Sequence, residues 1–331
     1  MTHEITKMTA MRPETARIGS ALRAGRFAIL AVLAVTACIP AFHSNYLNAI
    51  ATEIMIFAVF AMSLDLLIGY TGLLSFGHAA FFGIGAYTVM IANIQFGVSP
   101  WIGIPLGMIL ASVAAFVTGY FCLKATGLAF LMLTMAFSQL AFSVAVKWRA
   151  VTGGTDGLVG LQKPSIFGWS LSNPTAMFYL ALVVLVVSYF ILRRLVNSPF
   201  GHVLIGIREN ESRMRAIGFP VRLYKLAIFV IGGAFAGLAG GIYAIFNGYI
   251  SPDAFSWTAS GDPIIMIVLG GIGTLVGPVI GAAILLLLKQ IVSGYTEYWL
   301  FIIGVTFVIC VSFFPKGIVG RIVNLGGGRA P

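Results

Sequence analysis

The sequence predicts an all-α, polytopic integral membrane protein with about 8–10 transmembrane or half-membrane helices, including glycine-broken helices in each half. The chain is 59% hydrophobic and only 9% charged, whereas soluble domains carry about 25% charged residues. Apolar segments of about 20 residues, the length that crosses roughly 30 Å of hydrocarbon, recur along the chain. Clustered glycines interrupt this apolar pattern at 69–87 and at 270–281.

Each apolar segment is an expected membrane span. The first is short, and a signal sequence is the alternative for it, but it lacks a clean small-residue cleavage site before the next segment, so we favour a span. The cysteines lie inside such segments without disulfide or metal spacing, so we expect them to be small core residues: Cys38, Cys122 and Cys310. The expected spans are 27–42, 47–69, 79–96, 101–122, 126–146, 174–192, 223–246, 263–288 and 298–314.

The net charge of +10 could indicate binding to nucleic acid, but its distribution along the chain is the one that membrane topology requires. We therefore expect no nucleic-acid partner. Lysine and arginine gather in the tail 1–26, in 193–225 and near the C-terminus, whereas 147–173 holds few of them. The positive-inside rule places the rich regions in the cytoplasm. We therefore expect a basic cytoplasmic tail, a transmembrane domain with a cytoplasmic loop at 193–222, and a cytoplasmic C-terminal tail, with the boundaries 1–26, 27–315 and 316–331.

Segment 263–288 decides whether this topology is consistent. If it crosses once, Lys316 and Arg321 fall outside. The conflict disappears if the segment enters from outside as a short half-helix, breaks and returns. The stretch 270-GGIGTLVGPVIG-281 supports a break, because Pro278 removes a helical hydrogen bond and clashes with the preceding turn.

The glycine-rich segments are expected to line a transport path. Gly69, Gly72 and Leu74 align with Gly270, Gly273 and Leu275. Broken backbone is tolerated at membrane depth only inside protein or along a cavity, and paired breaks point to a translocation path. N–H groups at a half-helix N-terminus can face an anionic group such as a substrate carboxylate. The candidate path residues are Asp65, Tyr70, Gly72, Ser75, Gly77, His78, Gly270, Gly273 and Gly277.

Other roles stay open for several of these residues. Small residues also let membrane helices pack closely; we favour packing for Gly83, Gly85, Gly237, Gly240 and Gly241, and leave hinge and packing roles open for the path glycines. Asp65 is an intramembrane acid, which is a functional candidate by default. It could brace the backbone of 69–78, contact substrate or pair structurally, while Glu53 is expected to face the external interface. His78 has no metal-spaced partner, so packing is favoured over a proton relay. We predict no catalytic or metal site.

Longer blocks of the chain match a known family. The stretch 63-SLDLLIGYTGLLSFGHAAFFGIGAY-87 closely resembles the signature of the branched-chain amino acid permeases of the LivH/LivM type. The match continues in 152-TGGTDGL-158, 206-GIRENESRMRAIGFPVRLYKLAIFV-230 and 268-VLGGIGTLVGPVIGA-282. These blocks span most of 47–315. One departure is Asp262, where the family pattern usually has glutamate, and it leaves substrate preference open.

The resemblance implies a LivM-like permease subunit of an ATP-binding-cassette importer for leucine, isoleucine, valine or related small solutes. Its implied partners are a second, LivH-like permease, two cytoplasmic ATP-binding subunits, a periplasmic substrate-binding protein and membrane lipid. The implied location is a bacterial inner membrane, with both termini cytoplasmic. The chain has no GxxxxGK[ST] loop, so it is expected to bind no cofactor and to be no enzyme, with ATP used by the partner. The alternative is an ion-coupled secondary transporter, but that class is expected to carry more acidic residues inside its membrane spans.

The resemblance also gives the loop 193–222 a role. Residues 203–217 can form a short helix stopped by Gly218 and Pro220, which we interpret as a coupling helix that docks on the ATPase. The alternative is a solvated loop whose charges only set topology. The candidate contacts are Arg208, Glu209, Asn210, Arg213, Arg215, Ala216 and Gly218.

Overall fold

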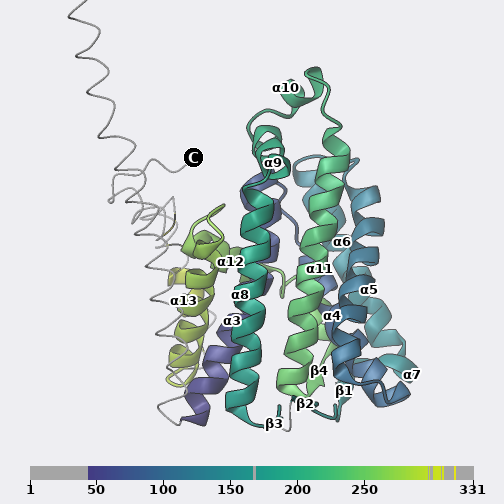
Figure 1. Cartoon of the computed structure of the whole chain (residues 1–331), viewed down its shortest axis with the longest axis vertical. Coiled ribbons are helices and arrows are strands. Elements are labelled where there is room, and N and C mark those ends of the chain that lie inside the picture. The colour runs from purple at the N-terminus through teal and green to yellow at the C-terminus, as the bar shows by residue number, and fades with distance from the viewer. Residues whose placement is uncertain are drawn as a thin grey trace, which may run out of the picture.

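The computed structural model describes residues 44–166, 169–296, 298, 301–306, 308 and 317. The expected tails 1–26 and 316–331, the span 27–42, Cys38 and Cys310 lie outside these residues, apart from Gly317. Within the described part, the chain folds into long helices with short strand pairs at one end (Figure 1). The prediction of an all-α, multi-pass membrane protein is confirmed.

Among the described residues, seven helices are long and apolar enough to cross a membrane. They match the spans expected between residues 47 and 288, and 301–306 within the last expected span is also helical. These helices are α3 (Asn45–Thr71), α4 (His78–Phe96), α5 (Pro100–Cys122), α6 (Leu128–Lys147), α8 (Pro174–Val196), α11 (Val221–Asn247) and α13 (Val276–Ser293). Shorter helices are α7 (Arg149–Thr152), α9 (Pro199–Glu209), α10 (Glu211–Ala216) and α12 (Gly261–Gly270), with 3₁₀ turns η2 (Gly154–Asp156) and η3 (Pro252–Phe255).

The two ends of the helix bundle differ. One end, called the strand end, carries the antiparallel pairs β1 (Leu158–Val159) with β4 (Tyr249–Ile250) and β2 (Ser165–Ile166) with β3 (Trp169–Ser170). The opposite end, called the arm end, carries α9 and α10, which stand above the bundle (Figure 1).

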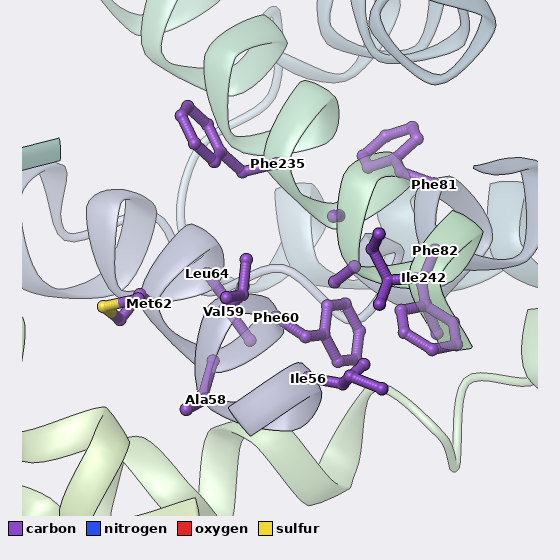
Figure 2. Close-up of a cluster of buried hydrophobic side chains, with 14 of the residues drawn as sticks. Ile56, Ala58, Val59, Phe60, Met62, Leu64, Phe81, Phe82, Phe235 and Ile242 are labelled. Carbon is purple, nitrogen blue, oxygen red and sulfur yellow. The ribbon is translucent and has the colours of Figure 1, made fainter. Parts of the chain in front are cut away.

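Helices α3, α4 and α11 form the centre of the fold. Helix α11 packs on α5, α4 and α3, and α3 packs on α13, α8 and α12. The most apolar window of α3 is 72% buried, whereas that of α6 is 22% buried. Outer helices therefore present apolar side chains outward, as lipid contact requires. Figure 2 shows Phe60, Phe82 and Ile242 gathered between the central helices.

Glycines let the central helices approach at backbone distance. A Cβ atom on Gly85 would collide with the carbonyl oxygen of Gly237, and one on Gly240 would collide with that of Phe82. A Cβ on Gly83 would lie 2.7 Å from the Phe255 ring. The packing role predicted for these glycines, and for Gly241 beside Val89, is confirmed.

Segment 263–288 breaks and returns. Helix α12 ends at Gly270, residues 271–275 are not helical, and α13 begins at Val276. The two helices pack side by side, since a Cβ on Gly281 would collide with the Met266 carbonyl. Helix α12 follows β4 at the strand end, and near the end of α13 the Gln290 amide donates to the Tyr46 hydroxyl at the start of α3 (2.9 Å). The chain therefore enters α12 from the strand end and α13 returns to that end, so the predicted half-helix, break and return are confirmed.

Candidate functional site

The first break, residues 72–77, separates α3 from α4. Helix α3 ends at Thr71 and is capped by Gly72, whose φ of 72° is a left-handed conformation that glycine adopts without strain. Helix α4 starts after Gly77, which has no side chain to cap it. Instead, the N–H of Ala79 donates to the hydroxyl of Ser260 at 2.9 Å. Ser260 directly precedes α12, so a residue of the second broken segment caps the helix that follows the first.

The second break, residues 271–275, is held in a rare backbone conformation. Gly273 has φ of 76°, and Leu275 has φ of 54°, which is uncommon for a residue with a side chain. The buried carboxylate of Asp65 accepts hydrogen bonds from the N–H of Gly273 (2.8 Å) and the N–H of Leu275 (3.4 Å). Strained backbone persists only where surrounding groups hold it, and Asp65 supplies that hold.

Gly69 and Arg208 complete this contact. A Cβ on Gly69 would lie 2.6 Å from the Gly273 Cα and 2.5 Å from the Asp65 carboxylate. Arg208, on α9, donates from its guanidinium to the carbonyl oxygen of Gly69, and its charge also acts on Asp65. We call the five residues Asp65, Gly69, Arg208, Gly273 and Leu275 the Asp65 node. The node joins α3, the second break and α9.

Asp65 therefore does not brace the backbone of 69–78, which was one of the roles expected for it. Its hydrogen bonds go to 271–275, because the second break packs directly on Gly69 and presents its N–H groups to the carboxylate. The alignment of the two glycine-rich segments did not predict that the end of α3 packs on the second break.

His78 is fully buried beside the first break. Its ring stacks on Phe60 with centroids 5.8 Å apart and 12° between the planes. Its Nε2 lies 2.9 Å from the Ser63 hydroxyl, which itself donates to the Phe60 carbonyl. Ser63 therefore accepts a hydrogen bond from the Nε2–H group of His78, and Nδ1 has no hydrogen-bond partner among the described residues. This geometry favours the packing role over a proton relay.

The remaining predicted path residues divide between the two breaks. Ser75 is buried and its hydroxyl accepts from the N–H of Gly77 (3.3 Å), and a Cβ on Gly77 would lie 2.6 Å from the Thr134 carbonyl. Tyr70 is buried near the end of α3. Gly270 and Gly277 face each other where α12 packs on α13, and a Cβ at Gly72 would lie 3.5 Å from the Arg208 side chain.

Helices α9 and α10 form an arm at the end of the bundle. The sequence predicts one short helix over 203–217, but the structure has two, because Asn210 is extended and its side chain caps α10 by accepting from the N–H of Arg213 (2.9 Å). The predicted contacts on the arm are exposed: Glu209, Asn210, Arg213, Arg215, Ala216 and Gly218. Arg208 is exposed as well, but its guanidinium also reaches inward to the Asp65 node.

Glu211 ties the arm to the bundle. Its carboxylate contacts Arg215 at 2.5 Å and Lys225, on α11, at 2.6 Å. Partial burial alone would raise the pKa of Glu211, but the hydrogen bonds and charges of Lys225 and Arg215 outweigh it and hold the pKa below its usual value. Glu211 is not among the residues predicted from the sequence. Its place at the start of α10, next to basic residues, could have indicated an ion pair.

A cavity of about 300 Å³ at the strand end also escaped sequence reasoning. It lies between α3, α4, α11, α12 and α13, and we call it the aromatic cavity. It is lined by Phe57, Phe60, Phe82, Tyr243, Asp262 and Lys289, among others. These residues are far apart in sequence, so no local pattern indicates the cavity. The charged residues within apolar segments, such as Asp262 and Lys289, were the feature of the sequence that could have pointed to it.

Comparison with known proteins decides the family. The model of the branched-chain amino acid transport system / permease component family matches residues 46–311. The chain belongs to this family. It is 28% identical over 314 residues to the high-affinity branched-chain amino acid transport system permease protein LivM of Salmonella typhimurium, covering 88% of this chain and 74% of that protein.

Two further relatives extend the match. The probable LivM permease of Methanocaldococcus jannaschii is 27% identical over 291 residues, covering 76% of this chain and 83% of that protein. The LivH permease protein of Escherichia coli is 23% identical over 282 residues, covering 80% of this chain and 91% of the relative. No solved structure matches the chain.

The family accounts for the architecture. The chain is a multi-pass transport permease, a class whose members are transport subunits rather than enzymes. The matches support the predicted permease role and do not support the ion-coupled alternative. The two breaks, the Asp65 node and the arm are thus parts of a permease.

Proposed function

We propose that this permease is a membrane subunit of a binding-protein-dependent importer in a bacterial inner membrane, moving branched-chain amino acids or related small solutes inward. Relatives named LivM and LivH support a pairing with a LivH-like second permease. Two cytoplasmic ATP-binding subunits consume the ATP, and a periplasmic binding protein delivers the solute. This chain binds no cofactor of its own.

The distribution of charge supports an orientation in which the arm end faces the cytoplasm. The strand end carries Lys147, Arg149 and Lys163, and more cations gather around the arm. The positive-inside rule favours a cytoplasmic arm end and a periplasmic strand end. Since α3 starts and α13 ends at the strand end, one further crossing on each side brings both termini to the cytoplasm. The cations of the arm end are Lys124, Arg193, Arg194, Arg208, Arg213, Arg215, Arg222 and Lys225.

The observation that carries the proposal is the link between the arm and the second break. Exposed residues of α10, including Arg213 and Arg215, contact the ATPase. Movement of the arm passes through Arg208 to Gly69, and the Asp65 carboxylate beside it holds the turn at 271–275. Because packed elements switch between discrete arrangements rather than deform gradually, release or reseating of this turn is the step that opens the path.

The first test is purification of the protein from native membranes under mild conditions, with mass spectrometry of everything that copurifies. Stoichiometric recovery of ATP-binding subunits and a second permease is the expected result. The complex, reconstituted with its binding protein, should take up leucine only when ATP is supplied. Recovery of this chain alone, able to move solute without ATP, would overturn the proposal.

A further inference from the structure

The aromatic cavity is placed where a solute from the strand end would arrive. At its outer side lie Tyr249, which is 42% exposed, and Asp253, which is also exposed. Deeper in the cavity lie Phe60 and Ala79, both of which are almost fully buried. The cavity therefore runs from the strand end into the protein, towards the start of α4.

One wall of the cavity is a continuous set of aromatic rings. Phe82 contacts Phe57, Phe60 and Tyr243 with ring centroids 6.1, 4.7 and 5.3 Å apart, and Phe57 also contacts Tyr243 at 5.8 Å. The rings come from α3, α4 and α11, and Figure 2 shows Phe60 and Phe82 side by side. Such a wall favours an apolar side chain, because contact with it removes apolar surface from water.

Charges of both signs accompany this wall. Lys289, on α13, and Asp262, in the first turn of α12, both line the cavity. The charge of Lys289 acts on Asp262 and on Glu53, on α3. Charges inside a membrane protein are costly and mark substrate pathways or structural pairs. Here a cation and a carboxylate lie next to a cavity rather than in packed protein, so a dipolar ligand can contact both.

We propose that the aromatic cavity binds a zwitterionic α-amino acid with an apolar side chain, an inference that rests on the proposed transport function. The ligand carboxylate faces Lys289, its ammonium faces Asp262, and its side chain lies against Phe57, Phe82 and Tyr243. The volume is at the lower end of the range of about 300–1,000 Å³ for ligand sites, which suits a single amino acid. An amine or a carboxylic acid alone leaves one of the two charges without a ligand partner.

The cavity also reaches the start of α4, which follows the first break, and the start of α12, which leads to the second. Ala79 lines it, and the N–H of Ala79 is bound by Ser260 just before α12. Phe60 lines it on one side and stacks on His78 beside the first break. A bound amino acid therefore contacts both α4 and α12, and through Phe60 it also contacts the ring that stacks on His78.

A cysteine-protection experiment tests occupancy directly. Ala259→Cys, at a lining position, is prepared in a background without the native cysteines, within the complete complex in nanodiscs. L-leucine should slow labelling by N-ethylmaleimide several-fold, whereas 3-methylbutylamine and 4-methylpentanoate, each with one charge, should protect less. Val159→Cys, 69% exposed at the same end and outside the cavity, is the control whose labelling should not change. Equal labelling of Ala259→Cys with and without leucine, in a complex that transports leucine, overturns the site.

Transport kinetics provide the second test. Lys289→Gln should raise the KM for leucine by about tenfold or more, since loss of a charged contact is costly. Lys289→Arg keeps the positive charge, so its KM should stay close to the wild-type value. Lys147→Gln, the same change at an exposed lysine of the strand end, should leave KM unchanged. An unchanged KM in both Lys289→Gln and Asp262→Asn would overturn the amino acid site in the cavity but not the proposed function. A wild-type complex that transports no amino acid would instead overturn the proposed function.

Discussion

The carboxylate of Asp65, near the end of α3, accepts a hydrogen bond from the N–H of Gly273, 208 residues further along the chain. This contact joins the end of α3 to the turn that divides α12 from α13. Arg208 reaches the same point from the arm, through the Gly69 carbonyl. A buried acid thus links the two halves of the permease at the place where each half is interrupted.

Replacing Asp65 by asparagine should destabilise the protein by about 1–3 kcal/mol, because one buried N–H of the second break loses its charged acceptor. The expected result is a lower Tm of the purified protein and reduced uptake. Glu209→Gln, an exposed acid on the arm, is the matched control and should leave Tm unchanged. A wild-type Tm in Asp65→Asn would show that the carboxylate does not hold the turn at 271–275.

Gly69→Ala should disrupt the contact between α3 and the second break. The added methyl would lie 2.5 Å from the Asp65 carboxylate and 2.6 Å from the Gly273 Cα, so backbone must move. We expect a loss of about 1–3 kcal/mol, as for other overpacked sites, measured by thermal unfolding. Gly304→Ala provides the control, because a Cβ there meets no atom of the described residues within 4 Å. Equal stability of the two variants would contradict the close packing at Gly69.

Arg208→Gln should uncouple ATP hydrolysis from uptake. Its side chain is the arm's contact with the Gly69 carbonyl, so removing its charge should leave the arm able to engage the ATPase but unable to move the second break. In reconstituted complexes, uptake per ATP hydrolysed should fall about tenfold, equivalent to roughly 1.4 kcal/mol of lost coupling. Lys124→Gln, an exposed cation at the same end, should keep the wild-type ratio. A wild-type ratio in Arg208→Gln would refute this route.

Acidification should loosen the arm at Glu211. The pKa of Glu211 is held below its usual value by Lys225 and Arg215, although burial opposes them. The stabilisation is therefore fully present above the ordinary glutamate pKa of about 4.3. It is lost as pH falls through the lower pKa of the folded protein. Hydrogen exchange of 209–217, corrected for the intrinsic pH dependence, should accelerate on acidification in the wild type but not in Glu211→Gln. Identical pH profiles would argue against the ion pairs.

The sequence by itself determined the class of protein, the spans between residues 47 and 288, and both breaks. These features are local, because hydrophobic runs, glycines and Pro278 act on their own stretch of backbone. The excess of lysine and arginine on one side also predicted the return of 263–288, which the structure confirmed. The blocks around 63–87 and 268–282 pointed to the family.

Only the tertiary structure decided what the breaks contact. Asp65 was selected from sequence, but its partners Gly273 and Leu275 come from the other half of the chain, and no local pattern encodes that pairing. Ser260 as the cap of α4, and the aromatic cavity with Lys289, depend in the same way on helices that meet only after folding. A side chain's chemistry is written at its own position, whereas its hydrogen-bond partners and the space beside it are set by packing across the whole bundle.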